Sequence, residues 1–266
     1  MIADNQDVTL PVQSLQVIKT VYKNAVTGRA VYKAYDADTQ LYYTIKTFNL
    51  QRPNAYHEIK REKVALNKLD RPDLFPRCYR VWQDRKHGSY LMLLDWMEGK
   101  TFEEAFKGAP EDDADARLRL LAWLELAKAI EVIHRKNILH RDLKPENVLL
   151  RNERRPKDGV MVIDFGLAVQ DRSSEEGSAG YQAPEQHVSR EENLRASADV
   201  FSIGQIGWRL FRGSTYSRYG DDDEIPKLPY GTEEVARIFF QATDRDPKKR
   251  PSVSSLKNMI RRLVKE

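Results

Sequence analysis

The residues best suited to chemistry lie between positions 138 and 166, in the segments ILHRDLKPENVLL and VIDFG. Asp142 precedes Lys144 and Asn147 by a few residues, and a second acid, Asp164, ends a β-branched run. In phosphoryl transfer one carboxylate orients the attacking hydroxyl and accepts its proton. A second carboxylate and an amide oxygen are ligands that suit Mg²⁺. The lysine could offset charge that gathers on the transferred group, so this set indicates phosphoryl transfer from a metal–nucleotide complex.

These segments resemble the catalytic loop (HRDxKxxN) and the DFG motif of protein kinases. The matching positions keep a fixed register, and they are His140, Arg141, Asp142, Lys144, Asn147, Asp164 and Gly166. The resemblance implies that Asp142, Lys144 and Asn147 act in catalysis. It also implies that Asn147 and Asp164 hold Mg²⁺, which Mn²⁺ could replace. So many matches in one register are strong evidence, whereas any three would be weak.

A strand upstream of these segments carries a candidate phosphate-binding lysine. Composition and turn signals predict strands over residues 15–22, 30–35 and 41–48. The period of two in the third strand places Tyr42, Thr44 and Lys46 on one face. A lysine on such a face is usually solvated, but YTIK resembles the kinase VAIK strand. The resemblance implies that Lys46 binds the α- and β-phosphates of ATP and that Thr44 and Val31 line the nucleotide.

The glycine-rich loop of kinases (GxGxxGxV) is largely missing. Its glycine positions are occupied by Asn24, Val26 and Arg29, and Gly28 remains, one residue out of register. Glycines allow close backbone approach to phosphates and positive φ angles. The substitutions therefore predict weaker nucleotide binding, although Gly28 is retained as a candidate contact. Arg29 could supply a cation to the phosphates or simply face solvent in a turn.

A helix is expected over residues 54–69. Its apolar stripe includes a charged residue, and the stripe consists of Ile59, Glu62, Leu66 and Leu69. A buried glutamate needs a partner, because an unpaired buried charge is costly. The kinase resemblance implies that Glu62 pairs with Lys46, and Glu58 is the alternative partner.

Residues 90–96 (YLMLLDW) predict a buried strand. The resemblance makes residues 95–99 the hinge between two lobes. Backbone groups of Asp95 and Met97 would then bind the adenine edge, and Leu94 would close the rear of the pocket. A core strand followed by an exit turn is the alternative interpretation.

Two later motifs complete the set of candidate site residues. The segment GSAGYQAPE resembles G-T-x-x-Y-x-A-P-E, with Ser178 at the threonine position. The resemblance implies that Ser178 bridges Asp142 and Lys144. Arg141, which precedes the catalytic acid, marks kinases that are controlled by phosphorylation of the segment before this motif. The family's phosphorylated position is occupied here by Ser174, with Ser173 as the alternative, although SSEE could be a plain polar turn.

The C-terminal part is expected to be helical. The run from residue 199 to residue 213 is apolar on nearly every face, which predicts a buried helix. The resemblance implies that Asp199, at its start, braces the catalytic loop. It also implies that Arg250 is the buried partner of Glu185.

The kinase resemblance covers residues 15–264 and implies a bilobal α+β fold. The expected parts are an N-terminal extension (1–14), a small antiparallel β-sheet lobe with one helix (15–94), the hinge (95–99) and a larger, mainly helical lobe (100–264). Residues 213–232 are rich in Asp, Pro and Gly, so the substrate-docking helix of the family is expected to be short or missing there.

Composition restricts the class of protein further. The formal net charge is only +4 over 266 residues, which implies no nucleic-acid partner. A single cysteine, Cys78, excludes an internal disulfide and fits a reducing compartment. The first residues do not resemble a signal peptide, and no run of apolar residues is long enough to predict a membrane span. A cytoplasmic location is expected.

Three functions compete. The resemblance favours a serine/threonine protein kinase that uses ATP and Mg²⁺ to modify a protein hydroxyl and could phosphorylate itself, because Lys144 is typical of enzymes acting on Ser and Thr. The altered glycine loop favours instead a pseudokinase scaffold, and a small-molecule kinase is the third possibility. The GSAGYQAPE segment argues against the third, because small-molecule relatives generally lack it. The oligomeric state is left open.

Overall fold

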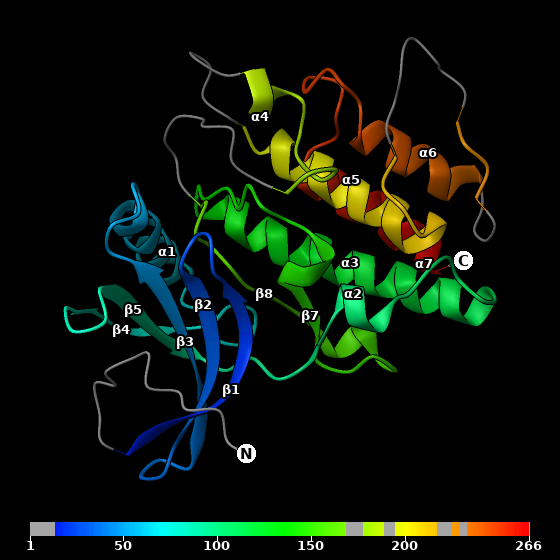
Figure 1. Cartoon of the computed structure of the whole chain (residues 1–266). Coiled ribbons are helices and arrows are strands. Elements are labelled where there is room, and N and C mark those ends of the chain that lie inside the picture. The colour runs from blue at the N-terminus through cyan, green and yellow to red at the C-terminus, as the bar shows by residue number, and fades with distance from the viewer. Residues whose placement is uncertain (1–13, 169–177, 189–194, 217–224, 229–232, 266) are drawn as a thin grey trace. The chain divides into compact units, whose positions relative to one another are not determined.

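The computed structural model describes residues 14–168, 178–188, 195–216, 225–228 and 233–265. The chain divides into two compact units, Met1–Met97 and Glu98–Glu266. The first is built mainly of strands and the second mainly of helices (Figure 1). The predicted α+β class is therefore confirmed. The two units are described separately below.

The first unit contains a five-stranded antiparallel sheet of order β1-β2-β3-β5-β4 and one long helix. These elements are β1 (Leu15–Asn24), β2 (Arg29–Asp36), β3 (Leu41–Asn49), α1 (Ala55–Leu69), β4 (Cys78–Asp84) and β5 (Ser89–Asp95). β-branched and aromatic residues make up most of the central strand β3, which favours a pleated, half-buried sheet.

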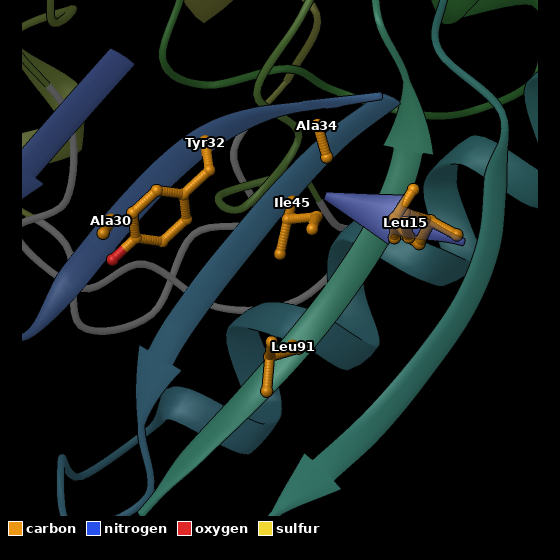
Figure 2. Close-up of a cluster of buried hydrophobic side chains, with 7 residues drawn as sticks. Leu15, Ala30, Tyr32, Ala34, Ile45 and Leu91 are labelled. Carbon is orange, nitrogen blue, oxygen red and sulfur yellow. The ribbon is translucent and has the colours of Figure 1, made fainter. Parts of the chain in front are cut away.

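The two faces of this sheet carry different chemistry. One face is filled by a buried apolar cluster formed by Leu15, Ala30, Tyr32, Ala34, Ile45, Leu91 and Leu93 (Figure 2). Side chains alternate along a strand, so Thr44 and Lys46 lie on the opposite face from Ile45. Helix α1 reaches that second face, because its Glu62 bonds Lys46. The apolar stripe predicted for α1 is buried as expected.

The second unit combines a three-stranded sheet of order β6-β7-β8 with helices. Its short elements are β6 (Lys100–Thr101), α2 (Phe102–Ala105), η1 (Pro145–Asn147), β7 (Val148–Leu150), η2 (Pro156–Asp158), β8 (Val160–Val162) and α4 (Glu185–Val188). Its longer helices are α3 (Asp113–Arg135), α5 (Ser197–Arg212), α6 (Glu233–Ala242) and α7 (Val253–Lys265).

Helix α5 forms the centre of this unit, as its apolar sequence predicts. Its small residues permit close packing: a Cβ atom added at Gly207 would lie 2.5 Å from the ring of Phe239 on α6. From α3, Trp123 donates a 2.9 Å hydrogen bond to the carbonyl of Ile203. Helix α5 is therefore held on both sides and offers a rigid support for the loops that begin and end near it.

The sequence spacing of the last helix predicts that Leu256, Met259, Ile260 and Leu263 point inward, and the structure differs in part. Leu256 and Ile260 of α7 are fully buried, but Met259 and Leu263 are only half-buried. The inward stripe is therefore narrower than the sequence pattern suggests. None of the described helices combines the length and the apolar character needed to cross a membrane.

Candidate active site

The carboxylate of Asp142 is held by Ser178 and Lys144. The Ser178 hydroxyl donates to Asp142 Oδ1 at 2.9 Å and accepts from Lys144 Nζ at 2.7 Å. Lys144 Nζ also lies 3.7 Å from Asp142 Oδ2. The three side chains form one chain of charge-assisted contacts, which fixes the direction of the carboxylate.

Asn147 supports the same residue from the other side. Its side-chain nitrogen donates to the Asp142 carbonyl at 2.8 Å and approaches Asp142 Oδ2 at 3.4 Å. This orientation is assigned from the hydrogen bonds, since amide nitrogen donates and oxygen accepts. The nitrogen of the Asn147 amide is thus turned toward Asp142, which leaves its oxygen as a possible metal ligand.

The second metal-binding candidate is delivered to the same end of the β7–β8 hairpin. Val148 pairs with Val162 across the hairpin, and the N–H of Ile163 donates to the Asn147 carbonyl at 3.0 Å. Asp164 follows immediately, with a left-handed φ of 65°. Two hard oxygen side chains therefore project from adjacent strand ends.

These residues fit Mg²⁺. Magnesium usually takes one or two carboxylates and completes its shell with water and phosphate oxygens, so it needs no larger protein cage. Within the described part of the chain, no group of three or more His, Cys, Asp or Glu side chains could hold a metal ion. A site made by Asn147 and Asp164 agrees with that chemistry.

His140 links the two acids through the backbone. Its ring is fully buried, and its Nε2 lies 3.1 Å from the carbonyl of Ile163. That carbonyl can only accept, so Nε2 carries the proton and Nδ1 accepts the N–H of Asp142 at 3.4 Å. The peptides that lead into Asp142 and Asp164 are thereby tied to one ring.

Asp199 holds the catalytic loop from α5. Its carboxylate accepts the N–H groups of His140 at 2.9 Å and Arg141 at 2.8 Å, and it bonds His134 Nε2 at 2.8 Å. Complete burial alone would raise the pKa of Asp199. The hydrogen bond and charge of His134, with those of the loop, instead hold this pKa below its usual value. Sequence reasoning missed His134, because a histidine in the last turn of a helix has many structural roles.

Arg141 is almost fully buried and adopts a left-handed φ of 69°. Its Nη1 lies 3.4 Å from the Leu167 carbonyl, at the start of the segment that leads to Ser178. The candidate regulatory residues Ser173 and Ser174 lie outside the described residues. Their relation to Arg141 stays a prediction.

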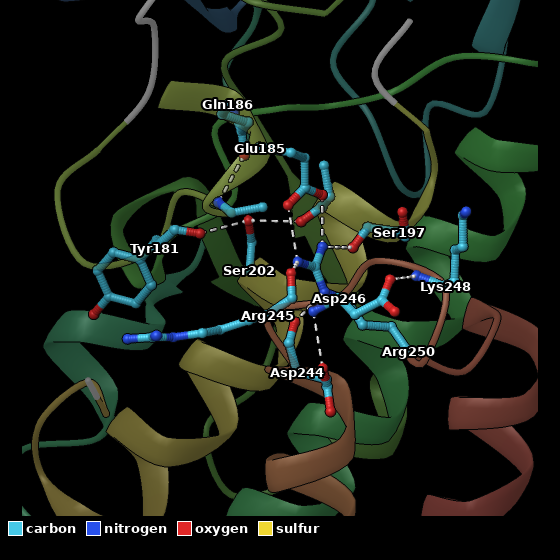
Figure 3. A network of polar contacts seen from close by, with 12 residues as sticks. Tyr181, Glu185, Gln186, Ser197, Ser202, Asp244, Arg245, Asp246, Lys248 and Arg250 are labelled. Carbon is cyan, nitrogen blue, oxygen red and sulfur yellow. Dashed lines mark hydrogen bonds and ion pairs between the residues drawn. The ribbon is translucent and has the colours of Figure 1, made fainter. Parts of the chain in front are cut away.

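Glu185 and Arg250 form a two-pronged ion pair with distances of 2.6 and 2.8 Å (Figure 3). The Arg250 side chain is 0% exposed and also donates to the Ser197 and Asp244 carbonyls. This arrangement anchors the end of the GSAGYQAPE segment to the start of α5.

In the first unit, Lys46 and Glu62 form a buried ion pair of 2.6 Å. The alternative partner, Glu58, lies near the N-terminus of α1, where it binds Arg52 at 2.8 Å. The helical register thus assigns a different cation to each glutamate.

The remaining nucleotide-binding candidates of the first unit share a sheet face. Val31 is the cross-strand partner of Lys46, and Thr44 is the partner of Leu94, so all four project to the same side. Met97, at the end of the unit, is half-buried.

The predicted hinge strand has one contact that no sequence pattern indicates. The Thr44 hydroxyl donates to the Asp95 carbonyl at 3.1 Å. The N–H of Asp95 donates to the Arg77 carbonyl, also at 3.1 Å. A carbonyl oxygen has two lone pairs, so the bond from Thr44 does not by itself saturate the Asp95 carbonyl.

The turn between β1 and β2 is closed by Asn24. Its side-chain oxygen accepts the N–H groups of Val26 and Thr27 at 3.0 Å each. Gly28 has a φ of 64°, and a Cβ atom there would lie 2.8 Å from the Cβ of Asn49. Glycine is therefore required at this position by the turn itself.

The side chain of Arg29 contacts two groups of the first unit. Its guanidinium lies over the Phe48 ring at 5.3 Å and 3.9 Å from Glu58. The buried carboxylate of Glu58 draws the arginine toward α1. Such a long-range pair has no local sequence signal.

Comparison with known proteins identifies the class. Residues 27–266 match the family model for the protein kinase domain, and the chain therefore belongs to this family. The fold with its sheet-bearing first unit and helical second unit agrees with this assignment.

Several curated relatives are serine/threonine kinases. The chain is 27% identical over 263 residues to a probable serine/threonine-protein kinase of Dictyostelium discoideum, covering 91% of this chain and 30% of that protein. It is 30% identical over 213 residues to serine/threonine-protein kinase AtPK1/AtPK6 of Arabidopsis thaliana, with 76% and 42% covered. It is 29% identical over 229 residues to human 3-phosphoinositide-dependent protein kinase 1, with 80% and 39% covered. The chain thus spans less than half the length of each of these relatives.

Proposed function

We propose that this chain is an active serine/threonine protein kinase that transfers the γ-phosphate of ATP, with Mg²⁺, to a protein hydroxyl, which could include its own. The observation that carries the proposal is the contact chain joining Lys144, Ser178 and Asp142. A scaffold without catalysis would have no need for a carboxylate whose direction is fixed in this way.

The residues of the second unit would take separate roles in proton acceptance, charge neutralisation and metal binding. Asp142 would orient the acceptor hydroxyl and accept its proton, with Ser178 holding its carboxylate and Asn147 holding its backbone carbonyl. Lys144 would offset negative charge near the acceptor. Asn147 and Asp164 would hold Mg²⁺, and bound Mg–ATP supplies the phosphoryl group together with a cation that neutralises developing charge.

In the first unit, Lys46 would bind the α- and β-phosphates, and Glu62 would keep its ammonium in place through the 2.6 Å ion pair. Val31, Thr44 and Leu94 would line the adenine on their shared sheet face. Backbone groups of Asp95 and Met97 would bind its edge, and Gly28 would lie near the phosphates. Residues 95–99 are proposed as the hinge, within a kinase domain of residues 15–264 that follows an extension of residues 1–14.

A protein substrate with a Ser or Thr acceptor is favoured by Lys144 and by the GSAGYQAPE segment, which makes a small-molecule substrate less suitable. The near-neutral charge balance supports a partner other than nucleic acid. The single cysteine supports a cytoplasmic location.

A pseudokinase is the second candidate, and the β1–β2 turn favours it. Two N–H groups at the tip of this turn already bond Asn24, so they are less available to phosphate oxygens. Weak nucleotide binding would follow from this arrangement.

The deciding experiment is transfer of radiolabelled phosphate from Mg–ATP to the chain itself and to a generic basic protein. We expect transfer by the wild type and none above background by Asp142→Asn, while both bind Mg–ATP. Nucleotide binding without transfer by the wild type would favour the pseudokinase. Transfer at a similar rate by Asp142→Asn would contradict the assignment of Asp142.

A further inference from the structure

Gln186, in the short helix α4, is a polar side chain with 0% exposure. Burying an amide is costly unless its groups are hydrogen-bonded. Its oxygen accepts the N–H of Ala183 at 3.0 Å, and its nitrogen donates to the carbonyl of Arg141 at 3.1 Å. Figure 3 shows Gln186 above the Glu185–Arg250 pair, at the end of the GSAGYQAPE segment. The amide therefore connects this segment to the catalytic loop.

The bond from Gln186 to the Arg141 carbonyl restrains the peptide that leads into Asp142. The Arg141 carbonyl belongs to the same rigid peptide plane as the N–H of Asp142. Fixing the carbonyl therefore fixes the plane from which the Cα atom of Asp142 projects. The preceding N–H, that of Arg141 itself, is held by Asp199 at 2.8 Å. Arg141 is thus held on its N–H side by α5 and on its carbonyl side by α4.

This double attachment matters because Arg141 has a positive φ of 69°. A non-glycine residue in that region is strained, and this conformation persists only where neighbours enforce it. Without Gln186, the Arg141 carbonyl would lose its bond from the amide while the strained conformation remained. The peptide plane could then rotate, and the Asp142 carboxylate would turn with it.

We propose that Gln186 is a positioning residue for Asp142. The proposal rests on the function proposed above, because Asp142 is taken as the catalytic acid. The same segment then reaches the catalytic residue twice: Ser178 bonds its carboxylate, and Gln186 bonds the carbonyl of the residue before it. Placement of the GSAGYQAPE segment is thereby coupled to the orientation of the Asp142 carboxylate.

The test is Gln186→Met, which keeps the length and approximate volume of the side chain and removes both hydrogen bonds. The matched control is Gln205→Met on α5. Gln205 is also buried, at 3% exposure, and its amide exchanges two bonds with the backbone of Tyr216, at 2.8 and 2.9 Å. Gln205→Met therefore also removes two bonds between a glutamine side chain and the backbone.

We expect Gln186→Met to lower kcat on the order of tenfold to a hundredfold, as small misplacements of catalytic groups do. Its KM for ATP and its Kd for Mg–ATP should stay near the wild-type values. Gln205→Met should lower the Tm by a similar amount and leave kcat unchanged. A folded Gln186→Met variant with wild-type kcat, or an equal loss of kcat in Gln205→Met, would overturn the proposal.

Hydrogen exchange supplies a readout that does not depend on activity. In Gln186→Met the amide of Asp142 should exchange faster, whereas that of Arg141, held by Asp199, should not. Gln205→Met should change neither. A wild type without transfer activity would contradict the proposed function, yet faster exchange in the variant would still establish the attachment. Unchanged exchange at Asp142 would exclude this attachment. If Gln186→Met does not fold, Gln186→Leu replaces it.

Discussion

The side-chain oxygen of Asn24 accepts the backbone N–H of Thr27 at 3.0 Å, and it accepts the N–H of Val26 at the same distance. In a glycine-rich phosphate loop such N–H groups point at the nucleotide. Here they are satisfied inside the turn, so a phosphate must compete with Asn24 for them. The local bond between these residues thus has a direct consequence for nucleotide affinity.

Replacing Asn24, Val26 and Arg29 together by glycine should lower the KM for ATP. The substitutions release the two N–H groups and let the backbone approach the phosphates. One recovered hydrogen bond corresponds to roughly a three- to tenfold change. Steady-state kinetics with varied Mg–ATP measures it. Three glycines at Ala37, Asp38 and Thr39, in the next turn of the same sheet, provide the control and should leave KM unchanged.

An unchanged KM in the first triple variant would mean that the loop uses another geometry. The pseudokinase alternative would then lose its main support. A KM lowered equally in the control would show that general loosening of the sheet, rather than release of these N–H groups, is responsible.

The fold could be predicted largely because its motifs are local. Strands and helices depend on neighbours in sequence, and those expected over residues 15–22, 30–35, 41–48 and 54–69 are found in the structure. The pairs of Lys46 with Glu62 and of Glu185 with Arg250 could be predicted because the kinase motifs specify the positions of both partners. The contact of Arg29 with Glu58 was not, since it joins separate elements without a fixed spacing.

The hydrogen-bond partners of polar residues near the site likewise could not be predicted from the sequence. A buried glutamine such as Gln186 looks like any surface glutamine in the sequence, and only the folded chain reveals its 0% exposure. Thr44 was selected for its strand face, but its bond to the Asp95 carbonyl depends on the β3–β5 register. Sequence patterns predict which face a residue occupies, whereas hydrogen-bond partners across strands require three-dimensional positions.

Asp142 and Asp164 should differ in what their removal costs. Asp142→Asn should retain Mg–ATP binding and lose transfer by orders of magnitude, because positioning and electrostatics supply most of the catalysis. Asp164→Ala should also weaken metal-dependent nucleotide binding. Calorimetric titration with ATP, with and without Mg²⁺, separates the two. Equal Mg²⁺ dependence of binding in Asp164→Ala and the wild type would contradict its role as a ligand.

Phosphorylation at Ser174, or at Ser173, should raise activity. A phosphate would bring nearly two negative charges and could order the segment beside Arg141 through charge-assisted bonds. Intact-protein mass spectrometry after incubation with Mg–ATP should detect the modification, and Ser173→Ala/Ser174→Ala should be less active. Ser252→Ala, next to the start of α7, is the control. Full activity of the double variant without phosphate on either serine would exclude this switch.

Cys78 should react slowly with alkylating agents at neutral pH. Burial raises the pKa of its thiol to about 11, with Glu62 adding a smaller effect, and only the thiolate is nucleophilic. Since this is the single cysteine, the rate of iodoacetamide labelling against pH reports it alone. In the native protein the labelling rate should rise with pH until about pH 11. In urea-unfolded protein it should level off above roughly pH 8.5, the ordinary pKa of a cysteine thiol. Coincident profiles would contradict the burial effect.

The raised pKa of this thiol has a consequence for stability. A group whose pKa is higher in the folded state stabilises fully below its unfolded pKa and loses this contribution as pH rises toward the folded value. The wild type should therefore lose stability relative to Cys78→Ala between about pH 8.5 and pH 11. Denaturant unfolding of both proteins across this range measures the difference, and parallel stability curves would argue against it.

Disruption of the pair of Glu185 and Arg250 should destabilise the second unit strongly. The Arg250 side chain is 0% exposed, and it satisfies the Ser197 and Asp244 carbonyls as well as the carboxylate. Arg250→Met would leave these acceptors and the Glu185 charge without their partner. Losing one member of a buried pair typically costs about 3–5 kcal/mol.

A double-mutant cycle tests this pair. Glu185→Gln combined with Arg250→Met should destabilise less than the sum of the single variants, because the second change removes a charge that the first has already left unpaired. The exposed pair of Arg237 and Glu233 on α6, joined at 2.6 Å, is the control. Arg237→Met should leave the denaturation midpoint unchanged, since a solvent-exposed pair contributes little. Additive losses at Glu185 and Arg250 in urea unfolding would show that the two side chains act independently despite their contact.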